Sequence, residues 1–311
     1  MLNRRHIRIK VLQALYMYYN DGRDKKDLAL LEKSLEKSIS KLYELYLYLL
    51  VFLEELGAYA IQYEDTVKGR YVTNAKEIRN SIMLYDNEVI QKLTKSEVFH
   101  KATKAYKVQW AGDEDLLRKI FFDLKNQEVY NDFIQFSGQN KILEQEILLH
   151  ILKHYTSNYS LMTQHLEEQY YNWLDDKKIA VQMACRTIQM LATSDGKEEF
   201  LLPLSQNDDD NYEFASELMN KTISEDEKIE EILKSRISKW EPSQIAVIDL
   251  IILKMATCEF LNFPSIPAVV TINEYVELSK NYSTPQSKKF INGILDAVVK
   301  GLKQDGIMIK N

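Results

Sequence analysis

The sequence predicts an all-α protein, and three observations carry this prediction. Glycine and proline are scarce, with nine glycines and five prolines among 311 residues, whereas proteins on average contain about 7% and 5% of them. The first proline is Pro203, so all residues before it lack the ring that interrupts helices by removing an amide donor. Apolar residues also recur at the three- and four-residue spacing of helices through most of the chain.

The first expected helix covers residues 4–20, where Ile7, Val11 and Leu15 form one apolar stripe. Asp21-Gly22 ends it, and a long helical region with a near-heptad leucine pattern follows at about 25–60. Further helices are expected at about 74–94, 113–125, 127–136, 140–155, 158–172, 175–192, 209–221, 224–238, 242–262, 267–280 and 285–303.

The helix expected at 242–262 is apolar almost all round, which is typical of a helix at the centre of a bundle. Its charged exceptions are Asp249, Lys254 and Glu259. Because few polar residues are expected on a buried helix, these three stand out in the sequence.

Several classes of function are not expected. No G-x-G-x-x-G or G-x-x-x-x-G-K-[ST] motif occurs, so we expect no dinucleotide or P-loop site, no cofactor and no enzymatic activity. Cys185 and Cys258 are too far apart in sequence for a disulfide framework. The longest apolar stretch, residues 45–53, falls short of the roughly 20 residues that span a membrane. We therefore expect a cytoplasmic protein without a membrane partner.

The sequence gives little indication of a metal site. Glu146, His150 and His154 recur at four-residue spacing and could place three ligands on one helix face. No fourth ligand follows at a fixed spacing, and His165 with Glu168 does not supply the duplicated Glu-x-x-His of carboxylate-bridged metal bundles. We therefore expect no metal site.

The first twenty residues carry a basic cluster on an acidic protein. The net charge of the chain is −6, yet residues 1–20 contain Arg4, Arg5, Arg8 and Lys10 and no acid. Positive side chains at a helix N-terminus are unfavourable, because that end of the macrodipole is already positive. Their presence there indicates an anionic partner such as phosphate. The alternative is a solvated basic tail. Tyr16, further along this helix, either stacks on RNA bases or packs in the core.

A second cationic helix start lies at residues 284–293. Thr284 caps it, Pro285 starts it, and Lys288 and Lys289 place positive charge in its first turn. Gly293 costs about 1 kcal/mol relative to alanine inside a helix. We interpret this glycine as a place where a partner or a neighbouring helix approaches closely.

These two segments resemble the NusB family of transcription antitermination factors. The opening is similar in Arg4-Arg5-His6-Ile7-Arg8 and in residues 12–16 (LQALY), which match the family's A-L-Q-A-L-Y. Residues 266–280 (IPAVVTINEYVELSK) resemble I-P-x-x-V-A-I-N-E-A-V-E-L-A-K, and 287–296 (SKKFINGILD) resemble S-x-x-F-V-N-G-V-L-D. Residues 249–261 resemble the family's central helix. Cys258 stands where the family usually has tyrosine, and Gln286 where it usually has an acid.

The resemblance implies an all-α pair of helical bundles that binds boxA-type RNA of ribosomal-RNA leader transcripts together with the ribosomal protein NusE, and then modifies elongating RNA polymerase. The implied RNA-binding residues are Arg4, Arg5, Arg8, Tyr16, Gln286, Ser287, Lys288 and Phe290. The implied partner-binding residues are Asp249 and Glu259 on the central helix.

The resemblance also implies a domain division. Residues 1–20 and 206–303 form the expected NusB-like RNA-binding domain, and residues 21–205 are expected to be an inserted helical domain of unknown role. One alternative is a helical protein-interaction scaffold that has lost RNA binding. Another, a ribosomal-RNA cytosine methyltransferase with a NusB-like domain, would need a cofactor domain with glycine-rich turns, which this sequence lacks.

Overall fold

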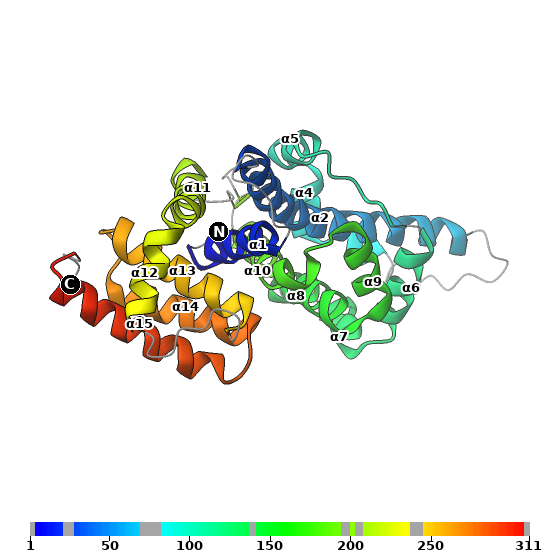
Figure 1. Ribbon diagram of the computed structural model, residues 1–311. Coiled ribbons are helices and arrows are strands. Elements are labelled where there is room, and N and C mark those ends of the chain that lie inside the picture. Colours follow the sequence, from blue (N-terminus) through cyan, green and yellow to red (C-terminus); the bar gives the residue numbers. More distant parts are fainter. Residues whose placement is uncertain are drawn as a thin grey trace. The chain divides into compact units, whose positions relative to one another are not determined.

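The computed structural model describes residues 4–20, 28–68, 82–112, 114–136, 141–193, 200–202, 208–236 and 245–307. Within these ranges every regular element is a helix (Figure 1), which confirms the all-α prediction. The chain divides into two compact units. We call Leu2–Ile39 with Ser205–Asn311 the split unit, and Ser40–Leu204 the central unit.

The split unit is built around one buried helix, α13 (Val247–Asn262). Every residue of α13 from Ile251 to Phe260 is buried, and the helix packs against α1, α11, α12, α14 and α15. This confirms the expectation of a helix at the centre of a bundle. The other helices of the unit are α1 (Arg4–Asn20), α2 (Leu28–Lys68) as far as residue 39, α11 (Asp208–Ser224), α12 (Asp226–Arg236), α14 (Ala268–Tyr282) and α15 (Ser287–Gln304).

The central unit is organised around the remainder of α2. All residues of α2 from Leu45 to Leu53 are buried, so the longest apolar stretch of the sequence is part of a helical core. No described helix combines the length and the apolar character needed to cross a bilayer. The other helices are α4 (Glu88–Thr94), α5 (Glu97–Ala105), α6 (Glu114–Lys125), α7 (Glu128–Phe136), α8 (Lys141–Asn158), α9 (Ser160–Gln169) and α10 (Trp173–Thr193).

Two differences from the predicted helices have local reasons. The helix expected at 74–94 is interrupted at Asn87, whose side chain accepts hydrogen bonds from the amides of Val89 and Ile90 and so caps α4; residues 69–81 lie outside the described ranges. Helix α5 was not expected. Its N-cap is Ser96, whose hydroxyl accepts a hydrogen bond from the Phe99 amide. In the sequence this single N-cap residue follows almost directly on the end of α4.

We expect the buried hydroxyl of Tyr46 to contribute to the stability of the central unit. It lies 2.7 Å from the Thr187 hydroxyl and accepts a hydrogen bond from the Leu202 amide at 3.1 Å. Tyr46→Phe leaves both groups without this partner, and should lower the free energy of unfolding by about 1–3 kcal/mol. Urea unfolding followed by circular dichroism measures this change.

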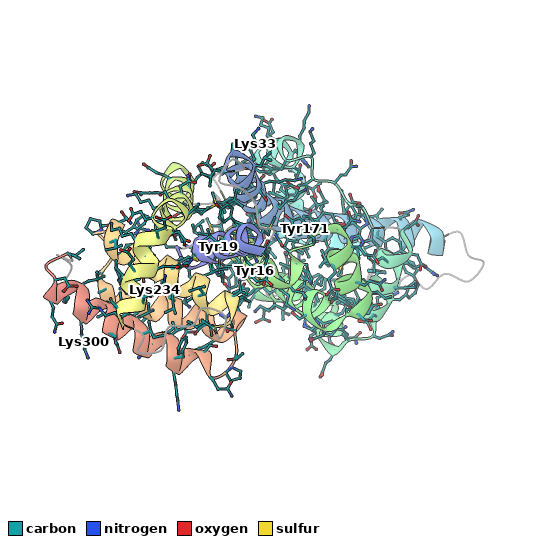
Figure 2. The ribbon with its side chains drawn as sticks, in the orientation of Figure 1. Tyr16, Tyr19, Lys33, Tyr171, Lys234 and Lys300 are labelled. Carbon is teal, nitrogen blue, oxygen red and sulfur yellow. The ribbon has the colours of Figure 1, made fainter. Side chains whose placement is uncertain are left out.

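The matched control is Tyr171→Phe, since Tyr171 is 72% exposed and is labelled in Figure 2. This change should alter stability by less than about 0.5 kcal/mol. If both variants unfold at the same urea concentration, the buried hydroxyl network contributes nothing to stability.

Candidate nucleic-acid interface

The basic start of α1 borders an open cleft in the split unit. The first turn of α1 contains no acidic residue, so the positive end of the helix dipole and the arginine side chains reinforce each other. The cleft has a volume of about 460 Å³ and is lined by Arg4, Arg5, Arg8, Ser265, Ile266, Pro267, Val270 and Glu274.

A second helix begins at the same cleft. Pro267 occupies the N-cap position of α14, and no side chain there caps the first amide groups. Exposed helix N-termini are suited to anions because their amide donors lack partners within the helix. The cleft therefore combines three arginines with the start of a second helix, and Glu274 is the one acidic residue among its lining side chains.

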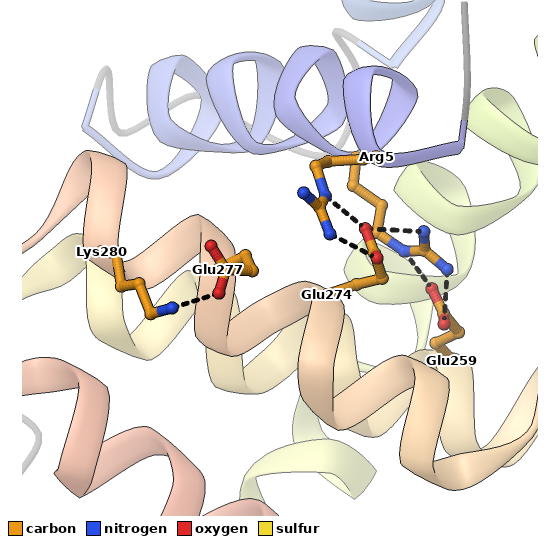
Figure 3. A network of polar contacts seen from close by, with 6 residues as sticks. Arg5, Glu259, Glu274, Glu277 and Lys280 are labelled. Carbon is orange, nitrogen blue, oxygen red and sulfur yellow. Dashed lines mark hydrogen bonds and ion pairs between the residues drawn. The ribbon is translucent and has the colours of Figure 1, made fainter.

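Arg5 and Glu274 form a bidentate ion pair at the edge of this cleft (Figure 3). The two hydrogen bonds measure 2.8 and 2.7 Å, and the hydrogen bond from Arg5 lowers the pKa of the Glu274 carboxyl. The Arg5 side chain is still 42% exposed. Arg4 is exposed as well, and its guanidinium lies 5.2 Å from the centre of the Phe214 ring. Both arginines are therefore accessible from solvent.

Arg8 is placed differently, because its side chain is buried against Glu259 of α13. Its Nε and a terminal nitrogen each donate to one Glu259 oxygen at 2.8 Å. The two side chains are 2% and 0% exposed. Burial acts to lower the pKa of Arg8, but the hydrogen bond to Glu259 and the nearby negative charges raise it overall. The pair is a buried, fully charged contact between α1 and α13.

Two side chains of α14 complete the environment of Glu259. The Thr271 hydroxyl donates to one carboxylate oxygen at 2.7 Å, and the Tyr275 hydroxyl donates to the other at 3.1 Å. Burial raises the pKa of the Tyr275 phenol well above its ordinary value, so it remains protonated and able to donate. The Glu259 carboxylate thus accepts four hydrogen bonds, which is the condition under which a buried charge is tolerated.

A second buried pair joins the starts of α13 and α15. The Ser287 hydroxyl donates to Asp249 at 2.6 Å, and these residues are 4% and 5% exposed. Thr284 lies 2.8 Å from the same Ser287 hydroxyl. Ser287 therefore fixes the first turn of α15 to the central helix.

These two pairs depart from the expected roles of their members. The resemblance assigned Arg8 and Ser287 to RNA and Glu259 and Asp249 to a protein partner, whereas in the structure the four side chains contact one another in the interior. Direct contacts of these residues with RNA or NusE stay predictions. To make such contacts, each side chain would have to leave a buried hydrogen-bonded partner, which is costly.

The remaining predicted residues lie at the surface. Gln286 and Lys288 are exposed at the start of α15, where Phe290 is 39% exposed. Tyr16 of α1 is 42% exposed. Tyr19, by contrast, donates a hydrogen bond to Asp226 at 2.8 Å and has a structural role.

Gly293 lies on this exposed part of α15. A Cβ atom built on Gly293 would meet nothing within 4 Å among the described residues. The expectation of a neighbouring helix at this glycine is therefore wrong for the described part of the chain, because open space surrounds it.

The two cationic helix starts are connected electrostatically through α14. Glu277 forms an ion pair with Lys280, which makes the largest contribution to lowering the Glu277 pKa. Arg5 of α1 and Lys288 of α15 lower it further. Because charge interactions weaken beyond about 10 Å at ordinary salt, one carboxylate on α14 lies within reach of both cationic segments.

Sequence reasoning missed the residues that organise this surface. Thr271, Glu274 and Tyr275 all come from the segment 266–280, where three- and four-residue spacing places Thr271 with both Glu274 and Tyr275 on one side of a helix. That spacing was available in the sequence, but their partners on α1 and α13 were not. Phe214, which lies within 5.4 Å of Arg8, carried no comparable signal.

The metal-ligand candidates of the central unit do not form a site in the described residues, where no group of three or more possible ligands could hold an ion. His150 stacks on His154 with ring centres 5.2 Å apart and lies 2.6 Å from the Gln127 side-chain oxygen. Both cysteines are free and buried.

Loss of the buried charge at Glu259 should destabilise the split unit. Glu259→Gln removes the carboxylate that accepts both Arg8 hydrogen bonds and leaves Glu274, 3.9 Å from Arg8, as the remaining opposite charge; it should cost about 3–5 kcal/mol. The control Glu277→Gln removes the exposed ion pair with Lys280 and should cost about 1 kcal/mol or less. Thermal unfolding of both variants measures the difference, and equal midpoints would contradict the structural role of Glu259.

Comparison with known proteins identifies the relatives of this chain. Residues 174–300 match the model described as the NusB family. The matched range begins at residue 174, inside the segment 21–205 that we expected to be an insertion. The first part of the split unit ends at residue 39 and not at residue 20. The expected limits of the insertion therefore stay a prediction.

Three similar relatives are each named transcription antitermination protein NusB. The one from Salinibacter ruber is 33% identical over 143 residues, covering 44% of this chain and 89% of the relative. The one from Chloroherpeton thalassium is 34% identical over 99 residues, covering 32% and 47%. The one from Natranaerobius thermophilus is 38% identical over 94 residues, covering 30% and 68%. The chain belongs to the NusB family.

Proposed function

We propose that this protein is a non-enzymatic transcription antitermination factor that binds boxA-type ribosomal-RNA leader RNA together with NusE. In this proposal the assembled complex promotes processive elongation by RNA polymerase. Membership of the NusB family and the name shared by the relatives support the role in antitermination. The surface of the split unit supports RNA as the ligand.

One observation carries the RNA proposal: two cation-bearing helix starts border the same helix, α14. Arg4 and Arg5 lie at the start of α1 beside the cleft, and Lys288 follows the start of α15. Arg5 pairs with Glu274 of α14, and α15 packs against α14. A phosphate backbone, with regularly spaced negative charges, is suited to a surface of this kind.

The accessible side chains divide into two proposed roles. Arg4, Arg5 and Lys288 would contact phosphates, because guanidinium and ammonium groups supply most backbone contacts in nucleic-acid complexes. Tyr16 and Phe290 would stack on unpaired bases, which is the usual way in which proteins hold single-stranded RNA. Gln286 would offer an amide for a base edge or a phosphate.

The buried pairs would then act as positioning residues. Arg8 and Glu259 attach α1 to α13, and Ser287 and Asp249 attach α15 to α13. Holding both cationic segments on one rigid helix reduces the entropy lost when a flexible ligand binds. In our proposal these four residues therefore contribute to RNA binding indirectly, by holding α1 and α15 in place.

Removal of the exposed arginines should weaken RNA binding and reduce its salt dependence. The variant is Arg4→Ala with Arg5→Ala, and the probe is a fluorescent boxA-like RNA titrated by anisotropy over a salt series. Each lost phosphate contact should reduce the slope of log affinity against log salt by about one. Adding NusE to the same titration should raise the affinity of the unmodified chain.

The matched control for this experiment is Lys234→Ala with Lys300→Ala. These two exposed lysines belong to α12 and α15 of the same unit (Figure 2), so the net-charge change is identical. If both double variants lose the same affinity and slope, the start of α1 is not the binding site. Absence of RNA binding by the unmodified chain would instead favour the protein-interaction scaffold.

Gly293 offers a test of close RNA approach that separates binding from stability. Gly293→Ala should raise the free energy of unfolding by up to about 1 kcal/mol, because alanine favours the helix and open space receives its methyl group. In our proposal the same change lowers RNA affinity, and Gly293→Leu lowers it further. Unchanged affinity in both variants would place the RNA elsewhere on the unit.

A further inference from the structure

A separate groove lies in the central unit, between α8 and α10. The two helices pack against each other, and the groove on their outer side has a volume of about 620 Å³. Four cationic side chains line it: Lys153 from α8, and Lys177, Lys178 and Arg186 from α10. Among the described residues, none that lines it is acidic. The groove therefore concentrates positive charge on a chain whose net charge is −6.

Among the described residues, none of the four cations forms an ion pair within 4 Å. This differs from Lys101, Lys119 and Lys221, each of which pairs with a carboxylate four residues earlier on its own helix. The acids nearest in sequence lie towards the start of each helix, at Glu144 and Glu146 on α8 and at Asp175 and Asp176 on α10. None of these four carboxylates lines the groove.

Between the cations the groove exposes more apolar than polar surface, although Thr156, Ser157, Gln182 and Gln189 also line it. Val181 is half-buried there, and the Thr156 hydroxyl already donates to the Leu152 carbonyl at 2.6 Å. The Cys185 thiol is 8% exposed, and burial raises its pKa, so it remains neutral. The groove presents a floor without charge between cationic rims.

This combination distinguishes between two kinds of anionic ligand. Proteins hold single-stranded RNA by stacking bases on aromatic side chains, and none of the described residues that line this groove is aromatic. An amphipathic helix places apolar side chains in a groove and directs its polar side chains to the rims. Charge complementarity then requires that the polar residues of such a helix be acidic.

We propose that the groove between α8 and α10 binds an amphipathic helix of a partner protein whose apolar stripe is flanked by acidic residues. The apolar stripe contacts the floor at Val181 and Cys185. Its carboxylates pair with Lys153 and Lys177 or Lys178 and with Arg186 at the rims. This site does not depend on the proposed RNA-binding function, because all of its residues belong to the central unit.

The test uses two synthetic helical peptides of about 18 residues, each roughly 27 Å long. The first carries leucines along one face with glutamates on both sides, and the second has lysine in place of every glutamate. Fluorescence anisotropy measures their binding to the full chain at low and at physiological salt. The acidic peptide should bind, with affinity falling as salt rises, and the lysine peptide should not.

Two groove variants and one control complete the experiment. Neutralisation of Lys153, Lys178 and Arg186 to glutamine should lower affinity for the acidic peptide about tenfold, as expected for three rim ion pairs. The control neutralises Lys95, Lys101 and Lys104 of the same unit, which removes the same charge and should leave affinity unchanged. Val181→Ser should lower affinity without changing its salt dependence, and thermal unfolding confirms that each variant is folded.

Each contrary outcome overturns the proposal in a recognisable way. Equal binding of the two peptides, no binding of the acidic peptide, or equal losses in the groove and control variants would show that the groove does not select an acidic helix. Single-stranded RNA binding that is lost only in the groove variant would assign the groove to nucleic acid. Concentration-dependent self-association that is lost in the groove variant would assign it to a second copy of the chain.

Discussion

The split unit depends on one buried carboxylate, that of Glu259. It accepts hydrogen bonds from Arg8 of α1 and from Thr271 and Tyr275 of α14, so three helices meet at a single charge on α13. Such a charge is stable in the interior only when its counter-charge and its hydrogen-bond donors are all in place. The contact therefore specifies one arrangement of these helices. The apolar contacts around α13 are non-directional and restrict that arrangement less.

This constraint also determines what reaches the surface. With Arg8 held in the interior, Arg4 and Arg5 are the arginines of α1 that remain accessible beside the start of α14. The pair of Ser287 and Asp249 acts in the same way on α15, where it fixes the first turn and leaves Lys288 and Phe290 outside. Both cationic segments are thus positioned by polar contacts to one apolar helix.

The central unit is stabilised differently. Its core contains aromatic side chains along α2, including Tyr46 and Phe52, and no buried ion pair comparable to that of Arg8 occurs among its described residues. Its buried polar contacts include that of the uncharged Tyr46 hydroxyl with Thr187 and Leu202, which are 141 and 156 residues away in sequence. Its most unusual charged feature is on the surface, where cations of α8 and α10 line a groove that no described acidic residue lines. The two units therefore concentrate positive charge by separate means.

The sequence by itself determined the helical class, the order of most helices and the buried position of α13, because these follow from periodicity and from scarce glycine and proline, which are local properties. It also indicated which segments carry the family motifs. It did not determine which of the charged residues face solvent. Arg4, Arg5 and Arg8 look alike in sequence, and only tertiary packing decides that one of them is buried: Arg8 meets Glu259, 251 residues away. Pairing between distant residues depends on how helices pack, and no local pattern encodes it.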